Sequence, residues 1–167
     1  MSDWFFMLGE PLGAAERAQV RAYLAGLGLD GDLPIESVPD FGSAGRIATH
    51  PEWDRRWWDA EQRERERLRK KAASARGEDQ LVLALSRGLE QSIAGWHGAV
   101  AVQAARAGGA DPGLIRAAAG ALGEALQLGK LAELAGEPPS HPFSLKRALF
   151  AGGHWPLGIV TGRYYVF

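Results

Sequence analysis

The most regular hydrophobic pattern of the chain lies in residues 79–136 and predicts a hairpin of two helices. In its first half, apolar residues recur at spacings of three and four, the period of one buried helical face: Val82, Leu85, Leu89, Ile93, Trp96 and Val100. Gly108 ends this helix, and Asp111-Pro112 supplies a cap and a first-turn proline for the next. Because the connection is short, the two helices are expected to lie antiparallel and adjacent.

Residues 1–39 alternate between strand and helix patterns. The run Trp4–Leu8 is short, aromatic and continuous, which favours a buried strand. An amphipathic helix is expected from Ala14 to Leu27, and residues 33–38 alternate like an edge strand before Pro39. No glycine-rich phosphate loop follows the first strand, so this β-α-β-like start predicts no nucleotide site.

The composition changes at Pro51, where a long charged helix is expected over residues 51–76. Proline and acidic residues suit a helix start, and the basic segment Arg67–Lys71 suits the later turns. Several acids precede a base by four residues, the favourable helical order: Glu52–Arg56, Asp59–Arg63, Glu61–Arg65 and Glu66–Lys70. The apolar stripe that would dock this helix is interrupted by Glu64. Residues 40–50 are interpreted as a loop.

Residues 140–167 predict a short helix around residues 144–150, followed by a C-terminal strand or hairpin. The last nine residues are β-branched and aromatic, and Thr161-Gly162 can turn a hairpin or mark a bulge. This run is expected to pair with the strand at Trp4. The resulting fold class is α+β and predominantly α-helical, with a central antiparallel helical hairpin and a small sheet from the N- and C-terminal strands, all within one domain spanning residues 1–167.

Composition narrows the environment and the chemistry. The chain has 167 residues, a formal net charge of −1 and no cysteine, which removes disulfides and thiolate sites. Its longest uncharged stretch, residues 91–105, is shorter than the ~20 apolar residues that a membrane span needs. The N-terminus lacks the basic region of a signal peptide. A soluble, cytoplasmic protein without membrane contact is expected.

The charged helix raises the possibility of nucleic-acid binding, because many arginines lie near Trp57 and Trp58. The interleaved acids neutralise this positive field, so a solvated helix is favoured and nucleic acid is disfavoured as a partner.

A metal or cofactor site is a second alternative. Glu90 and His97 lie seven residues apart on one side of the first hairpin helix, and Glu124 and His154 could face them. The chain has no His-x-x-x-His and no Glu-x-x-His spacing, so no helical turn supplies two adjacent ligands. A structural His97 is favoured, and no cofactor is predicted.

The C-terminal segment contains the candidate binding surface. Lys146, Arg147, His154 and Arg163, together with Trp155, could receive an anion or an acidic partner. The structural interpretation, in which Phe143, Phe150 and Trp155 anchor the core, is favoured over binding. Because loops often carry function, this segment is the first place to look for binding.

Small residues recur along the first hairpin helix, at Ala84, Gly88, Ser92, Gly95 and Ala99. A glycine inside a helix costs ~0.5–1 kcal/mol relative to alanine, so their number calls for compensation. Close approach of another helix would supply it, either inside the hairpin or across a dimer interface.

The sequence therefore predicts a non-catalytic protein-interaction module of an accessory, adaptor or immunity type, which binds a protein partner and self-associates. The alternative is an enzyme or a cofactor- or metal-binding protein with a site between the hairpin helices around His97.

Overall fold

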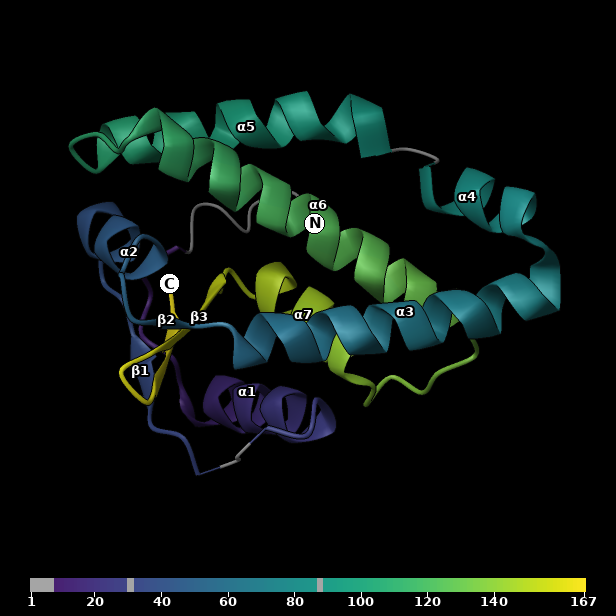
Figure 1. Cartoon of the computed structure of the whole chain (residues 1–167). Helices are drawn as coiled ribbons and strands as arrows, with labels where there is room; N and C mark the ends of the chain where they lie inside the picture. Colours follow the sequence, from purple (N-terminus) through teal and green to yellow (C-terminus); the bar gives the residue numbers. More distant parts are fainter. Residues whose placement is uncertain (1–7, 30–31, 87–88) are drawn as a thin grey trace.

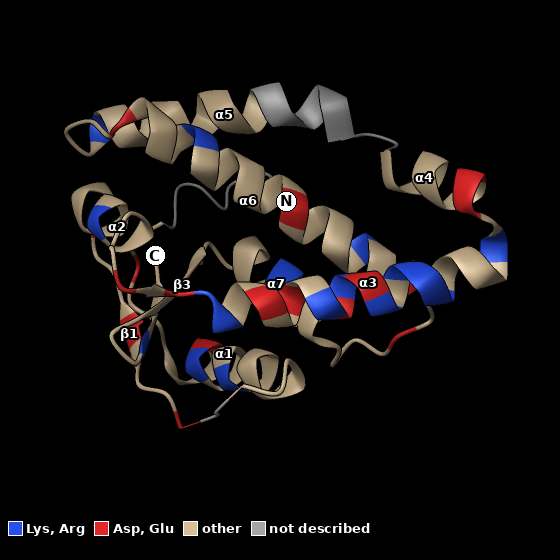
Figure 2. Ribbon diagram, in the orientation of Figure 1, with Lys and Arg blue, Asp and Glu red and all other residues tan. Residues whose placement is uncertain are grey.

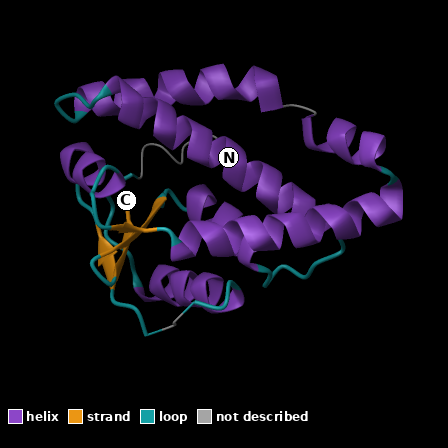
Figure 3. Ribbon diagram, in the orientation of Figure 1, coloured by secondary structure: helices purple, strands orange, loops and turns teal. Residues whose placement is uncertain are grey.

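The computed structural model describes residues 8–29, 32–86 and 89–167, except for the side chains of residues 89–94. These residues form a predominantly helical α+β fold with a small mixed sheet, as the sequence predicted (Figures 1 and 3). In chain order the elements are α1 (Ala14–Gly26), β1 (Ile35–Ser37), α2 (Phe41–Ala48), β2 (Trp53–Asp54), α3 (Arg56–Arg76), α4 (Glu78–Ser86), α5 (Leu89–Arg106), α6 (Pro112–Leu134), α7 (Pro142–Ala151), β3 (Pro156–Val160) and β4 (Arg163–Val166).

The sheet has the strand order β1-β4-β3-β2. Strand β4 is parallel to β1 and antiparallel to β3. The β3–β4 hairpin turns at Thr161 and Gly162, whose φ angles of 47° and 74° are the positive values that a tight hairpin turn uses. This confirms a hairpin at that dipeptide. The expected strand at Trp4 lies outside the described residues, and the neighbours of β4 are β1 and β3.

The central helical hairpin consists of α5, which runs along one edge of the molecule, and α6, which packs against it and runs from their shared turn toward the interior (Figure 1). The side chain of Asp111 accepts hydrogen bonds from the backbone N–H groups of Gly113 and Leu114, and Pro112 is the first residue of α6. The predicted restart signal is therefore confirmed. Helix α6 also packs against α7 and α3, which places it at the centre of the fold.

The first half of the hairpin differs from the sequence expectation. One continuous helix was expected from Asp79, whereas α4 ends at Ser86 and α5 begins at Leu89. Val82 was assigned to the buried stripe, but it is 51% exposed, and Leu81 is the buried residue of this turn. The reason is that α4 packs against α3 as well as α6, so a different side of the helix is covered.

The segment before α3 also differs from the expectation. Residues 41–48 form α2 instead of a loop, because Asp40 caps this helix by accepting a hydrogen bond from the Ser43 N–H. Helix α3 begins at Arg56 and not at Pro51, since Trp53 and Asp54 pair with β3 as strand β2.

The interior is filled where the sheet, α1, α3, α6 and α7 meet. Phe143, Phe150 and Trp155 are all buried there, which confirms them as core anchors. Trp155 packs against Phe167, the last residue of the chain. No helix among the described residues is long and apolar enough to cross a membrane.

Candidate functional site

Lys146 on α7 lies in the interior and forms an ion pair with Glu61 on α3. Its ammonium nitrogen is 2.8 Å from each carboxylate oxygen of Glu61, and the two side chains are 3% and 1% exposed. The hydroxyl of Tyr23 on α1 donates to the same carboxylate at 2.5 Å. A buried charge is stable only when it is paired and hydrogen-bonded, and the contacts among Lys146, Glu61 and Tyr23 meet this requirement. Because the three residues come from different helices, the network joins α1, α3 and α7 at one point.

Two aromatic residues complete this buried network. The indole N–H of Trp57 donates to the Tyr23 hydroxyl at 2.6 Å, and the Lys146 ammonium lies 5.4 Å from the centre of a Trp57 ring. Burial, followed by the charge of Glu61, raises the pKa of Tyr23 well above its usual value. Tyr23 is therefore a neutral donor. Lys146 was predicted to lie on a binding surface, whereas the structure places it inside this network.

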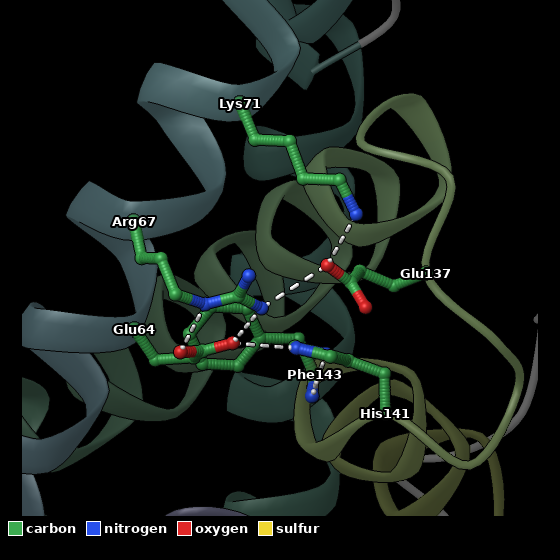
Figure 4. Close-up of polar contacts among 6 residues, drawn as sticks. All are labelled: Glu64, Arg67, Lys71, Glu137, His141 and Phe143. Carbon is green, nitrogen blue, oxygen red and sulfur yellow. Dashed lines mark hydrogen bonds and ion pairs between the residues drawn. The ribbon is translucent and has the colours of Figure 1, made fainter.

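A second network ties α3 to the loop before α7 (Figure 4). Glu64 accepts hydrogen bonds from Arg67 and from Nε2 of His141, the latter at 2.7 Å. Nδ1 of His141 accepts from the backbone N–H of Phe143, so it caps α7, and the ring hydrogen is on Nε2. Glu64 was expected to interrupt the docking of α3, but it forms one of its attachments.

Glu137 extends this network on the solvent side. Its carboxylate accepts from Arg67 at 3.1 Å and from Lys71 at 2.9 Å. Hydrogen bonds from Arg67 and Lys71 lower the pKa values of Glu64 and Glu137, respectively. Arg67 and Lys71 are thus paired with carboxylates of the same chain, in agreement with the prediction of a neutralised helix.

The expected pairs along α3 form only in part. Glu66 and Lys70 are 3.4 Å apart, as predicted. Glu61 instead pairs with Lys146, and Arg65 pairs with Glu124 at 3.1 Å.

The remaining residues of the predicted C-terminal surface do not gather on one exposed face. His154 and Trp155 are each 5% exposed. Arg147 is 41% exposed and lies 3.9 Å from Glu133, while Arg163 is 51% exposed and pairs with Glu36. A binding role for these residues remains a prediction. They do not form one shared surface that would support it.

His154 lies buried with an unpaired ring nitrogen. Its Nδ1 has no hydrogen-bond partner in the described part of the chain. Burial lowers the pKa of His154, and the negative charges of Glu16 and Glu10 only partly oppose that shift.

The residues of the predicted metal or cofactor site are also separated. The side chain of Glu90 lies outside the described residues, and His97 is half-buried on α5. Glu124 points to α3 and α7, since its carboxylate contacts Arg65 and lies 3.9 Å from the Lys146 ammonium. Over the residues that the structure describes, no three histidines or carboxylates form a group that could hold a metal ion.

The large hydrophobic side chains that remain exposed lie on α4 and α5. In the described residues these are Val82, Leu83 and Val102, which are 51%, 47% and 50% exposed. Sequence reasoning missed them because it assigned Val82 to the core. The signal that could have revealed them is the three adjacent apolar residues 81–83, which cannot all face one side of a helix.

Among the hollows that adjoin the described helices, two have large apolar residues in their lining. The larger, of about 590 Å³, lies between α2 and the α5–α6 turn and is lined mainly by small residues, with Phe41 and Leu114. The smaller, of about 390 Å³, lies between α3, α4 and α6, and Leu81, Leu128 and Leu131 form much of its lining. Only the smaller hollow adjoins exposed apolar side chains.

Comparison with known proteins adds no relative to this picture. No protein-family model matches the chain, and neither a curated protein nor a solved structure matches it.

Proposed function

We propose that this chain is a non-catalytic interaction protein that self-associates through the apolar side of α4 and α5. The observation that carries the proposal is the position of Val82, Leu83 and Val102. These are the large hydrophobic side chains left exposed among the described residues, and all three lie on these two helices. Val82 and Leu83 are neighbours on α4, and Val102 lies toward the far end of α5. Exposed apolar side chains of this size mark surfaces that a protein partner can cover.

The distribution of charge supports the same surface. Charged residues are dense along α3, whereas the described part of α5 carries one only near its C-terminal end, at Arg106 (Figure 2). On α4 the acidic residues Glu78 and Asp79 are confined to the first turn. Faces with so few charges can approach each other with little like-charge repulsion and little cost of desolvating ions. A second copy of the same face therefore meets little electrostatic resistance.

The glycines of α5 support a close approach. A β-carbon at Gly95 or Gly98 would meet nothing within 4 Å, and both residues are exposed. These glycines are therefore not used for packing inside the hairpin, which was one of the two expectations. A helix from a second copy would use the space above them and offset their helix cost of ~0.5–1 kcal/mol each.

The polar groups inside the fold also favour interaction over catalysis. Lys146, Glu61 and His141 are buried in contacts that hold α1, α3 and α7 together. Their roles are explained by packing, so no reaction is needed to account for them.

Sedimentation velocity over a concentration series tests the proposal. The double variant Leu83→Glu/Val102→Glu places charges on the apolar side of both helices, and it should be monomeric at concentrations where the unchanged chain associates. The matched control is Ala22→Glu/Ala25→Glu on α1, where both positions are exposed. This control should associate like the unchanged chain. A chain that stays monomeric at all concentrations, or two double variants that behave alike, would refute the proposal.

A further inference from the structure

The outward face of α4 combines two apolar side chains with a carboxylate. Asp79, Val82, Leu83 and Ser86 follow the i, i+3, i+4, i+7 spacing of one helical face, and all four are exposed. Leu81, on the opposite side, is 1% exposed and lies in the core. Within the described residues, Asp79 takes part in no ion pair and no side-chain hydrogen bond that would hold its carboxylate in place. Amphipathic helices use this spacing to seat in a groove of another protein.

The hollow of about 390 Å³ lies directly beside this face. Its lining is mostly apolar: Leu81, Leu128 and Leu131 lie almost fully buried at its base, and Val82 and Leu85 of α4 give it accessible apolar surface. Arg65 and Arg69 of α3 line it as well, and its lining contains no carboxylate. The hollow therefore suits an apolar helix that carries an acidic residue at one end.

We infer that α4 of a second copy occupies this groove, so that two copies form a symmetric dimer around α4. This inference rests on the proposed self-association and narrows the contact to α4, so Val102 and the glycines of α5 lie outside it. Val82 and Leu83 of each copy lie against Val82 and Leu85 of the other, and Asp79 of each copy approaches the arginines at the groove of its partner. In a two-fold interface each contact occurs twice, which doubles its effect.

The position of Val82 and Ser86 supports the symmetric arrangement. Both residues line the groove and also belong to the outward face of α4. A surface that contributes to both halves of an interface lies next to the two-fold axis. A second copy of α4 thus offers apolar residues to the apolar lining of the groove and an acidic residue to its arginines.

Of the two arginines, Arg69 can exchange its partner at the lower cost. Arg69 is bonded to Glu78, with side chains that are 55% and 51% exposed, and Arg65 is paired with Glu124. The Arg69–Glu78 pair is exposed and contributes little to stability, so Arg69 can turn toward an incoming carboxylate. The Arg65–Glu124 pair is half-buried, with side chains that are 34% and 22% exposed, so Arg65 moves at a higher cost.

Charge reversal in sedimentation velocity tests the arrangement. Asp79→Arg places a base against the arginines of the partner, and Arg69→Glu or Arg65→Glu places an acid against Asp79. Each single variant should dimerise at least tenfold more weakly than the unchanged chain. When Asp79→Arg is mixed with one of the two arginine variants, both contacts of the mixed dimer become attractive. Its dissociation constant should return to within about threefold of the unchanged value.

The mixing experiment also controls for misfolding, because a variant that cannot fold cannot restore a dimer. Two further single variants separate this inference from the proposed function. Leu83→Glu should abolish the dimer and Val102→Glu should leave it intact, since Val102 lies on α5 and not on α4.

If the unchanged chain is monomeric, the proposed function fails and the inference fails with it. If it dimerises but neither mixture restores association, or Val102→Glu alone abolishes it, the inference is wrong and self-association through another part of the surface stands. Binding of a different protein at α4 by a monomeric chain would likewise overturn the inference.

Discussion

The Lys146 ammonium on α7 is 2.8 Å from both carboxylate oxygens of Glu61 on α3, and neither side chain is more than 3% exposed. The two residues are 85 positions apart in the chain. Each neutralises the charge of the other in a region where water cannot do so, so removing one leaves a buried, unpaired charge. The contact therefore makes each residue dependent on its partner.

Lys146→Met should destabilise the chain strongly, because it leaves the Glu61 carboxylate without its cation. A loss of about 3–5 kcal/mol is typical for breaking a buried pair from one side. The double variant Glu61→Gln/Lys146→Met should recover at least half of that loss, since glutamine is neutral and still accepts from Tyr23. Urea unfolding measures both values. If the losses of the single variants Lys146→Met and Glu61→Gln simply add in the double variant, the pair is not coupled and the account of this network is wrong.

The Glu64 network should make stability depend on pH in the acidic range. Arg67 and His141 lower the pKa of Glu64 in the folded chain. Such a carboxyl group stabilises the fold above its unfolded pKa of about 4.3, and this contribution is lost as pH falls through the lower folded pKa. Urea unfolding should show the unchanged chain more stable than Glu64→Gln at pH 7, with a gap that narrows below about pH 4.

Glu66→Gln is the control for that experiment, because Glu66 is exposed and pairs with Lys70 four residues later. It should change the free energy of unfolding by only a few tenths of a kcal/mol. A gap for Glu64→Gln that is equally small, or that does not depend on pH, would contradict the role given to Glu64.

His154 should titrate below the usual histidine value, since burial lowers its pKa. The unfolded chain then binds a proton near pH 6.5 while the folded chain does not, so stability falls as pH decreases below that value. NMR titration of the ring protons measures the pKa directly, and His154→Gln should reduce the loss of stability between pH 6.5 and 5. A pKa at or above 6.5 would contradict this interpretation.

Replacing Gly158 on β3 by a residue with a side chain should destabilise the fold. A β-carbon there would lie 2.5 Å from the indole nitrogen of Trp53, and its φ of +120° is unfavourable for other residues. Gly162 has a φ of +74° but open space around it. Gly162→Ala should therefore cost about 1 kcal/mol through backbone strain alone, and Gly158→Ala about 1–3 kcal/mol more through overpacking. Thermal unfolding compares them, and equal losses would show that the contact with Trp53 relaxes freely.

The features that sequence reasoning predicted correctly depend on neighbours in the chain. Asp111 and Pro112 restart a helix through bonds within one turn, and Thr161-Gly162 turns a hairpin through its own backbone angles. The aromatic core anchors of the tail were also recognised as an alternative. Such local signals act over a few residues, so the sequence alone reveals them.

The features that sequence reasoning missed depend on residues that are far apart in the chain. Glu61 was assigned to a pair with Arg65 four residues away, whereas its partner Lys146 belongs to another helix. Val82 was placed in the core because its spacing matches a buried stripe, but the packing of α4 on α3 covers Leu81 instead. Periodicity identifies an amphipathic helix, but the neighbours decide which side is buried.

The absence of cysteine from the chain permits one direct measurement of the proposed contact between copies. Val82→Cys would place a single thiol beside the two-fold axis of the inferred dimer, and a disulfide forms only when two Cα atoms come within about 7 Å. Under mild oxidation this variant should form a covalent dimer much faster than Ala22→Cys, which places its thiol on the exposed side of α1. Equal, slow cross-linking of the two variants at concentrations where the unchanged chain associates would contradict association through α4.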